Sequence, residues 1–268
     1  MLSLKKSAPV ARRSSTATMT ALVVTCEHGG NRIPAPYRNL FRHYRVLLES
    51  HRGFDPGALV IAAELARRCD AALLTSTVSR LLVDLNRSIG HQQLHMDSVR
   101  GLPLAIRQQI IDHYYQPYRT EGERLVAEAV SRCGKVIHIS CHSFTNNYNG
   151  VVRQADIGLL YDPARPEERM LCAHWKSALR ASAADLEVRR NFPYQGRNDG
   201  FTSALRRKFR PEVYLGIELE LNQKNTLLPD KQWAPLRESV ITTFHAALRS
   251  LSLNVCPSEQ LCCAGTVS

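Results

Sequence analysis

The sequence predicts a single three-layer α/β/α domain around a mixed, largely parallel β-sheet. Short apolar, β-branched runs of strand length alternate along the chain with longer segments of helical periodicity, which is the order typical of this class. No internal repeat is visible, and 268 residues are enough for one domain with a sizeable core. We expect the domain to span residues 20–252, between a disordered basic tail (1–19) and an irregular C-terminal tail (253–268).

The individual elements follow from the spacing of apolar residues. Strands are predicted where apolar, β-branched runs end in polar or turn-forming residues, at 20–26, 71–76, 80–85, 136–140, 157–161 and 213–221. Helices are predicted where apolar residues recur at three- and four-residue spacing, at 56–68, 103–129, 166–183 and 233–251. Pro56 suits a first helical position, and Pro117 should interrupt the second helix.

Composition and charge narrow the class of protein. Hydrophobic residues make up 44% of the chain, yet no apolar run approaches the roughly 18–20 residues of a membrane span. The net charge is +11, but the Lys and Arg residues form no blocks and do not alternate with aromatics as in single-strand binders. We therefore expect a soluble, cytoplasmic protein without a nucleic-acid or membrane partner, whose charge suits a small anionic substrate. A homo-oligomer is left open.

The eight cysteines contain no C-x-x-C pair and no regular spacing, so they predict neither a zinc ribbon nor a disulfide framework. We expect free thiols, as is usual in a reducing cytosol. Cys26 and Cys141 each lie near a histidine, which raises a cysteine hydrolase as an alternative. However, Cys26 is too close to His28 along the strand to pair with it, and Cys141 should face away from His142.

Two predicted strands end close to a histidine, His28 and His142. Because neighbouring strands of an open α/β sheet share one crevice at their carboxyl ends, these imidazoles can meet there and bind a metal. His138 lies deeper on the same strand face as His142 and is expected to be a core residue. A catalytic zinc takes three protein ligands and a water. The third ligand is Asp55, which could instead cap a helix, or Glu27, whose side chain should point away from that of its neighbour His28.

A third strand carries two acids, Glu218 and Glu220, on one face of an otherwise apolar run. Burying them is costly unless they meet water, a cation or hydrogen-bond donors. One of them could act as general base on a metal-activated water. The alternative is an edge strand with a solvated acidic face.

Arginines and a turn-rich loop are candidates for holding an anionic substrate. Arg87 follows the run 80–85, and its planar guanidinium suits two-point binding of a carboxylate. The loop 191–200, with Asn191 and Tyr194, is of the type that covers a substrate, although it could be an ordinary connector. Further anion-binding candidates are Arg80, Arg153, Arg189, Arg190 and Arg206.

Together these residues resemble the N-formylglutamate amidohydrolase family over about residues 20–250. Each motif is weak alone, but the ordered set is specific. Such proteins are similar in fold to zinc carboxypeptidases and aspartoacylases, which use a His-x-x-Glu pair, a later His, an Asn-Arg pair for the substrate carboxylate and a Glu base. The motifs are Glu27-His28-Gly29-Gly30-Asn31, Phe54-Asp55-Pro56-Gly57, Ser79-Arg80 leading to Asp84-Leu85-Asn86-Arg87, His142-Ser143-Phe144, the segment 191–196, and Glu218-Leu219-Glu220.

The resemblance implies zinc-dependent hydrolysis of N-formyl-L-glutamate to formate and glutamate, late in histidine degradation. The x-x-Glu position holds Asn31, so Asp55 becomes the candidate for the second ligand. This departure keeps a non-catalytic binding protein open as an alternative, and a family match does not fix the acyl group. The residue roles implied are one Zn²⁺ on His28, Asp55 and His142; Glu220 as base in preference to Glu218; and substrate contacts from Asn86, Arg87, Arg80, Arg153, Asn191 and Tyr194.

Overall fold

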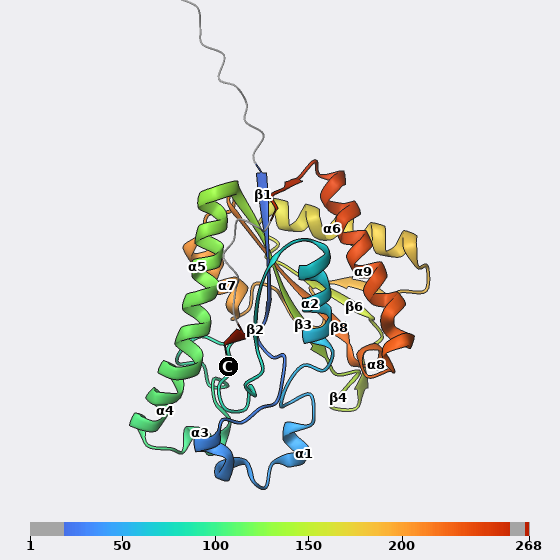
Figure 1. The fold of residues 1–268 in the computed structure, drawn as a ribbon. Helices are drawn as coiled ribbons and strands as arrows, with labels where there is room; N and C mark the ends of the chain where they lie inside the picture. The colour runs from blue at the N-terminus through green and yellow to red at the C-terminus, as the bar shows by residue number, and fades with distance from the viewer. Residues whose placement is uncertain (1–18, 258–265, 268) are drawn as a thin grey trace, which may run out of the picture.

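A mixed, largely parallel β-sheet lies between two layers of helices in the computed structural model, which describes residues 19–257 and 266–267 (Figure 1). Only β6 and β8 pair in antiparallel fashion among the sheet neighbours described. The predicted fold class is confirmed. Across the sheet the order is β10 (Thr266–Val267), β2 (Ala72–Ser76), β1 (Met19–Cys26), β3 (Gly134–Phe144), β8 (Tyr214–Asn222), β6 (Ile157–Leu160) and β7 (Val188–Arg190), with β9 (Asn254–Val255) on β1.

The helices divide between the two faces of the sheet (Figure 1). One face packs against α2 (Ala58–Arg68), α6 (Pro166–Ser182) and α9 (Asp230–Ser250). The other face packs against α5 (Gln116–Cys133) and α7 (Phe201–Lys208). The shorter elements are η1 (Ala35–Phe41), α1 (Arg45–Leu48), α3 (Asp97–Arg100), α4 (Leu104–Ile110), the π-helical η2 (Ile111–Tyr115), α8 (Gln223–Thr226), and a hairpin of β4 (Asn147–Tyr148) and β5 (Val151–Val152).

Strand alternation decides which face carries polar side chains. On β3, Ile137 and Ile139 pack in the core under α2, α6 and α9, whereas Val136 packs on the α5 side. Since side chains alternate along a strand, His138, Ser140 and His142 share the α5 side with Val136. Leu219 of β8 likewise packs against the α6 and α9 layer, which leaves its neighbours Glu218 and Glu220 on the α5 and α7 side. These five buried polar residues of the two strands therefore face the same helical layer.

Two of the predicted elements need correction. The run 80–85 is a turn-rich loop and not a strand: its apolar side chains are buried, but the amide of Leu82 bonds within a turn, to Ser79 O, and that of Asp84 bonds to Leu94 O. The apolar side chains of this loop are buried without the backbone pairing to a strand, and this burial gives the loop the apolar sequence pattern of a strand. The helix expected at 103–129 runs from Leu104 to Cys133, with the predicted interruption as the π turn just before Pro117.

The C-terminal segment is more regular than expected. Residues 254–255 and 266–267 form strands, whereas the remaining calls on tail residues 1–18, 258–265 and 268 lie outside the described residues. The expectation of free thiols is wrong for Cys133 and Cys256, which form a disulfide. They are 123 residues apart and meet only because β9 pairs with the start of β1, so spacing could not reveal the pair.

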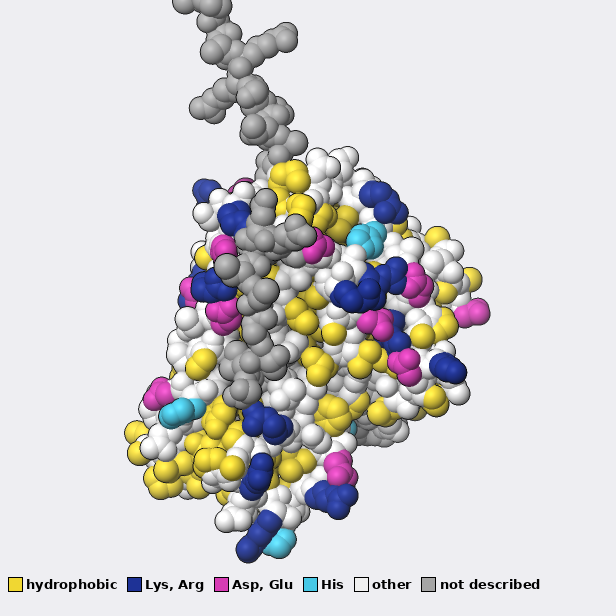
Figure 2. Space-filling model, viewed as in Figure 1, with side chains coloured by type: hydrophobic (Ala, Val, Ile, Leu, Met, Phe, Trp, Pro, Cys, Tyr) yellow, Lys and Arg dark blue, Asp and Glu magenta, His cyan; other side chains and the backbone are white. Residues whose placement is uncertain are grey.

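Two surface properties bear on the expected partners. No helix within residues 19–257 is long and apolar enough to cross a membrane. On the face shown in Figure 2, Lys and Arg side chains lie scattered, many beside Asp and Glu, and they do not form one continuous stripe.

The core between α6 and α9 provides a stability test. Trp175 is fully buried, its ring centroid lies 4.7 Å from that of Phe244, and its indole N–H donates to Val240 O at 3.2 Å. Trp175→Ala should lower the free energy of unfolding in urea by about 3–5 kcal/mol, because it leaves a cavity in the core. Val46→Ala, at a side chain 85% exposed, should change it by less than about 0.5 kcal/mol. Equal effects of the two substitutions would contradict this packing.

Candidate metal centre and active site

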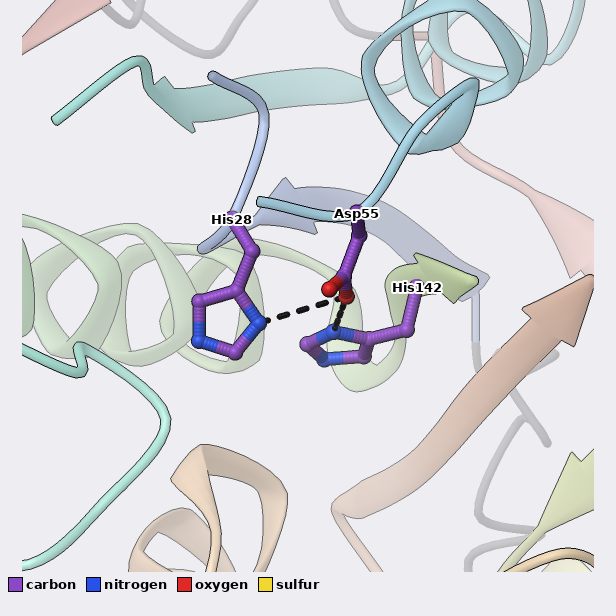
Figure 3. A group of neighbouring side chains, drawn as sticks. All are labelled: His28, Asp55 and His142. Atoms are coloured by element: carbon purple, nitrogen blue, oxygen red, sulfur yellow. Dashed lines mark hydrogen bonds and ion pairs between the residues drawn. The ribbon is translucent and has the colours of Figure 1, made fainter. Parts of the chain in front are cut away.

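Three buried side chains meet at the carboxyl ends of β1 and β3 (Figure 3). His28 follows β1, His142 lies near the end of β3, and Asp55 precedes α2. The Asp55 Oδ2 atom lies 2.9 Å from His142 Nδ1 and 3.3 Å from His28 Nδ1. One ligand atom from each residue lies within 4.8 Å of the others, so the set can hold a metal ion.

The second ring nitrogen of each histidine faces a different carboxylate. His28 Nε2 lies 2.7 Å from Asp84 Oδ1, and His142 Nε2 lies 3.2 Å from Glu27 Oε2. A carboxylate beside one ring nitrogen of an imidazole holds the proton on that nitrogen. The other ring nitrogen then keeps its lone pair and can bind a metal, as is usual for histidine ligands. Both Nδ1 atoms thus face Asp55 as potential ligands. Glu27 proves to be a partner of a ligand and not itself a member of the cluster.

Local backbone geometry brings Asp55 to the histidines. Its amide donates to His28 O at 2.9 Å, which ties the two loops together. Gly57 follows with φ of +81°, and a Cβ there would lie 2.5 Å from Thr226. Only glycine fits such a turn, so the Phe54-Asp55-Pro56-Gly57 motif is needed to aim the carboxylate before α2 begins.

Opposite charges support the buried acids. Burial alone would raise the pKa of Asp55 and of Asp84, but hydrogen bonds with His28 and the charge of Arg80 hold both pKa values well below their usual range. The guanidinium of Arg80 donates to Asp55 Oδ1 at 3.1 Å and to Asp84 Oδ2 at 2.7 Å. For His142, hydrogen bonds to Asp55 and Glu27 outweigh burial and raise its pKa. Arg80 and a protonated His142 therefore balance these carboxylates in the metal-free protein.

The two acids of β8 differ in their surroundings. Glu220 lies beside His142 in the strand register, and Glu218 lies beside Ser140. Glu218 Oε1 accepts a hydrogen bond from Thr202 Oγ1 at 2.7 Å, whereas the buried Glu220 Oε2 has no partner among the described residues. Burial, with the nearby negative charges, raises the pKa of Glu220 to about 8. Such a carboxyl can exchange protons near neutral pH, as a general acid–base requires.

The position of β8 rules out the edge-strand alternative. It pairs with β3 on one side and β6 on the other, and all nine of its residues are buried. Its acids are therefore kept in the interior at a free-energy cost, which points to a role in the site.

A pocket of about 620 Å³ opens above these groups. It is lined by the three cluster residues, both β8 acids, and several residues expected to bind substrate. Of those expected contacts, Asn86, Arg87, Arg80 and Tyr194 line it, whereas Arg153 and Asn191 do not.

The Asn86-Arg87 pair is held by its neighbours but keeps unused donors. Asn86 Oδ1 accepts from the Phe201 amide at 2.6 Å, and its Nδ2 lies 3.4 Å from His142 Nε2. Arg87 donates through Nη1 to Asp199 O at 2.8 Å, and its buried Nε has no partner among the described residues. Because Arg87 also lines the pocket, its guanidinium can offer a hydrogen bond to an anionic group there.

A support for this pair escaped the sequence analysis. Tyr115, in the π turn η2, donates to Arg87 O at 2.8 Å. Arg119 donates to Leu85 O at 3.1 Å, and its guanidinium lies 4.5 Å from the centre of the Phe201 ring. A π turn inside a helix often marks a functional site, and Pro117 was the clue to its position.

The remaining residues that were predicted to bind substrate or anions lie outside the lining of the pocket. Asn191 uses its amide oxygen to accept from the amides of Tyr161 (3.0 Å) and Gly196 (3.1 Å), which fixes the loop that carries Tyr194. Arg153 donates to Tyr194 Oη at 3.4 Å and stands at the rim. The other arginines serve elsewhere: Arg189 pairs with Glu187, Arg190 is exposed, and Arg206 pairs with buried Glu168.

Asn31 and His138 take structural positions. Asn31 Nδ2 donates to Leu48 O at 3.1 Å, outside the ligand cluster, and Asp55 supplies the carboxylate that Asn31 cannot. His138 bonds to Thr25 Oγ1 and Tyr214 Oη, each at 2.8 Å, and is a core histidine as expected.

The cysteine alternative lacks the required geometry. Cys26 and Cys141 are fully buried in the core that α2, α6 and α9 cover, on the face away from the pocket. Burial raises the pKa of both thiols, which opposes formation of a nucleophilic thiolate.

The carboxylate behind His28 offers a test of the metal site. Asp84→Asn should weaken zinc binding about 10- to 100-fold, because the imidazole loses its charged partner. The affinity is measured by competition with a chromophoric chelator. Asp97→Asn, at a pocket-rim carboxylate that is 91% exposed, is the matched control and should leave the affinity unchanged. Unaltered binding in Asp84→Asn would contradict the assigned ligand atoms.

The raised pKa of Glu220 makes stability depend on pH. Its folded pKa of about 8 lies above the unfolded value of about 4.3, so the native state binds the extra proton between them. This group's contribution therefore falls as the pH rises through that window. The side chain of the Glu220→Gln variant cannot ionise. When both proteins are freed of metal, the thermal stability of the variant relative to the wild type should therefore increase from about pH 4.3 and level off above about pH 8. A difference independent of pH would contradict the assignment.

Comparison with known proteins places this site in a family. The model of the N-formylglutamate amidohydrolase family matches residues 20–227, whereas no curated protein sequence matches the chain. The crystal structure of a gene product from Agrobacterium tumefaciens is similar, with a TM-score of 0.72 and 28% identity over 86% of this chain and 91% of that one. N-formylglutamate amidohydrolase from Ralstonia eutropha JMP134 shares the fold, with a TM-score of 0.62 and 21% identity over 88% and 96%. The chain belongs to the N-formylglutamate amidohydrolase family.

Proposed function

We propose that this protein is a zinc-dependent amidohydrolase that cleaves the N-acyl amide of an acidic amino acid. N-formyl-L-glutamate is the reference substrate, with formate and glutamate as products. The observation that carries the proposal is the His28, Asp55 and His142 cluster beside a buried carboxyl oxygen of Glu220 that has no hydrogen-bond partner among the described residues. Family membership supports the substrate class, since a relative of the same fold is named for that activity.

The donor set fits zinc. Two imidazole nitrogens and one carboxylate are a common catalytic combination, and His28, Asp55 and His142 would hold the ion. When bound, zinc lowers the pKa of a water toward about 7 and polarises a carbonyl oxygen. Arg80 contributes to the same centre because it fixes both Asp55 and Asp84.

Glu220 moves the proton. Its free Oε2 accepts a proton from the attacking water as the oxygen bonds to the acyl carbon. The same carboxyl then gives that proton to the amine nitrogen as the C–N bond breaks, so glutamate leaves with a neutral amine and the acyl group leaves as formic acid, which then loses its remaining proton to solvent. Glu218, held by Thr202, adds to the negative charge that raises the pKa of Glu220.

Arginines hold the substrate and the developing charge. Arg87 and Asn86, which both line the pocket, bind the α-carboxylate. Arg80 lines the pocket with its side chain 26% exposed, so its guanidinium can also stabilise the negative charge that develops on the acyl oxygen. Tyr194 closes the opposite rim.

The non-catalytic alternative rested on Asn31 in a ligand position. Because Asp55 supplies a third ligand atom at the cluster, this departure no longer favours a binding protein without a metal.

Removal of the metal is the first test. The purified protein should hold about one zinc per chain and release formate from N-formyl-L-glutamate. Chelation should abolish release, and zinc should restore it, because the water is not activated without the ion. Turnover that is insensitive to a chelator would refute the metal-dependent reaction.

Replacement of the proposed base tests the role of Glu220. Glu220→Gln should lower kcat about 10²- to 10⁴-fold at unchanged zinc content, since proton transfer is lost while the ligands stay. Glu218→Gln is the control on the same strand face, and its kcat should fall by no more than about tenfold. A larger loss for Glu218→Gln than for Glu220→Gln would reverse the assignment.

A further inference from the structure

A second cavity, of about 570 Å³, adjoins the catalytic pocket. It lies between the hairpin of β4 and β5 and the loop after β7. Tyr148 lines both spaces, so the two are neighbours across a single side chain. Its lining consists of Tyr148, Asn149, Val151, Val152, Arg153, Gln154, Arg189, Phe192 and Pro193.

The walls of this cavity are largely apolar, although they stand at the surface. Val151 is 68% exposed, Val152 is 51% exposed and Tyr148 is 49% exposed. Apolar side chains grouped in a surface hollow cost free energy unless something covers them, and such groups often mark a binding site.

The guanidinium of Arg153 does not make this cavity a strong anion-binding site. Its guanidinium lies 4.6 Å from the centre of the Tyr148 ring, 5.3 Å from that of Tyr194 and 5.9 Å from that of Phe144. Ring faces stabilise the cation and present an aromatic surface around it. The chemistry that fits the cavity is therefore an apolar chain or ring.

The order of the sheet sets the direction of a bound substrate. Arg87 belongs to the loop that follows β2, on one side of the metal cluster at the ends of β1 and β3. The second cavity belongs to segments that follow β3 and β7, on the other side. A substrate whose α-carboxylate is bound at Arg87 and whose amide lies at the cluster would direct its acyl group toward Tyr148.

We propose that the second cavity is an acyl-chain subsite, and that the protein hydrolyses N-acyl amino acids whose acyl group is an apolar chain longer than formyl. The inference rests on the proposed amidohydrolase function and specifies its substrate. Val151, Val152 and Phe192 hold the chain, and Tyr148 marks the passage from the catalytic pocket.

A series of substrates tests the subsite. The kcat/KM of the zinc-loaded protein is compared for N-formyl-, N-acetyl-, N-butanoyl- and N-hexanoyl-L-glutamate. It should rise with chain length, by up to about fourfold for each methylene that is fully buried. A kcat/KM that is highest for the formyl compound and falls with length would overturn the subsite and leave the amidohydrolase function intact.

Substitutions test where the chain binds. Val152→Asn places a polar group in the cavity and should lower the ratio of kcat/KM for the hexanoyl over the formyl substrate about tenfold. Val46→Asn, at an exposed valine of α1 outside both cavities, is the matched control and should leave the ratio unchanged. A ratio equal to that of the wild type in Val152→Asn would overturn the assignment.

A binding measurement separates the subsite from the reaction. N-hexanoyl-L-glutamate, added to chelated ¹⁵N-labelled protein, should shift the amide resonances of residues 151, 152 and 192, which line the second cavity and not the catalytic pocket, whereas N-formyl-L-glutamate should not. If no substrate in the series is hydrolysed but these shifts occur, the proposed reaction fails and the subsite stands. If the hexanoyl compound leaves these resonances in place, the subsite is refuted.

Discussion

The position of one buried carboxylate, that of Asp55, is the constraint on which the site depends. A single oxygen lies within hydrogen-bond distance of the inner nitrogens of His28 and His142, while the other oxygen bonds to Arg80. Glu27 and Asp84 stand behind the two rings. So much negative charge in the interior requires compensating positive charge. A divalent cation between the imidazoles and Asp55 would supply this charge, and without the cation Arg80 and a protonated His142 supply it.

The fold places these groups through two simple regularities. Parallel strands end at the same edge of the sheet, so β1 and β3 deliver their histidines to one place. Alternation along β3 and β8 then directs His142, Glu218 and Glu220 to the face that α5 and α7 cover, while aliphatic side chains fill the opposite core. The face of the sheet that carries the metal-binding cluster is therefore polar to considerable depth, down to His138, whose two ring nitrogens are both hydrogen-bonded.

Much of this arrangement could be predicted from sequence, because strand periodicity and motif order are local properties. The fold class and the meeting of His28 with His142 follow from such patterns, whereas Asp55 as the replacement for a ligand at Asn31 is suggested by the family resemblance. The loop at 80–85 could not be recognised, since burial under other segments mimics the apolar run of a strand. The Cys133–Cys256 disulfide and the support of Arg87 by Tyr115 join residues far apart in sequence, and only the tertiary structure brings them together. The expectation that the Glu27 side chain points away from that of His28 is confirmed, but its contact with His142 on the neighbouring strand is a tertiary contact that only the structure reveals.

The most direct test of the central claim is the position of zinc in crystals of the metal-loaded protein, measured by anomalous scattering at the zinc edge. The account predicts a single strong peak per chain, bonded to Nδ1 of His28, Nδ1 of His142 and the carboxylate of Asp55, with Glu220 facing the open side. A peak that excludes Asp55, or one bonded to Glu27 or Asp84 instead, would contradict it.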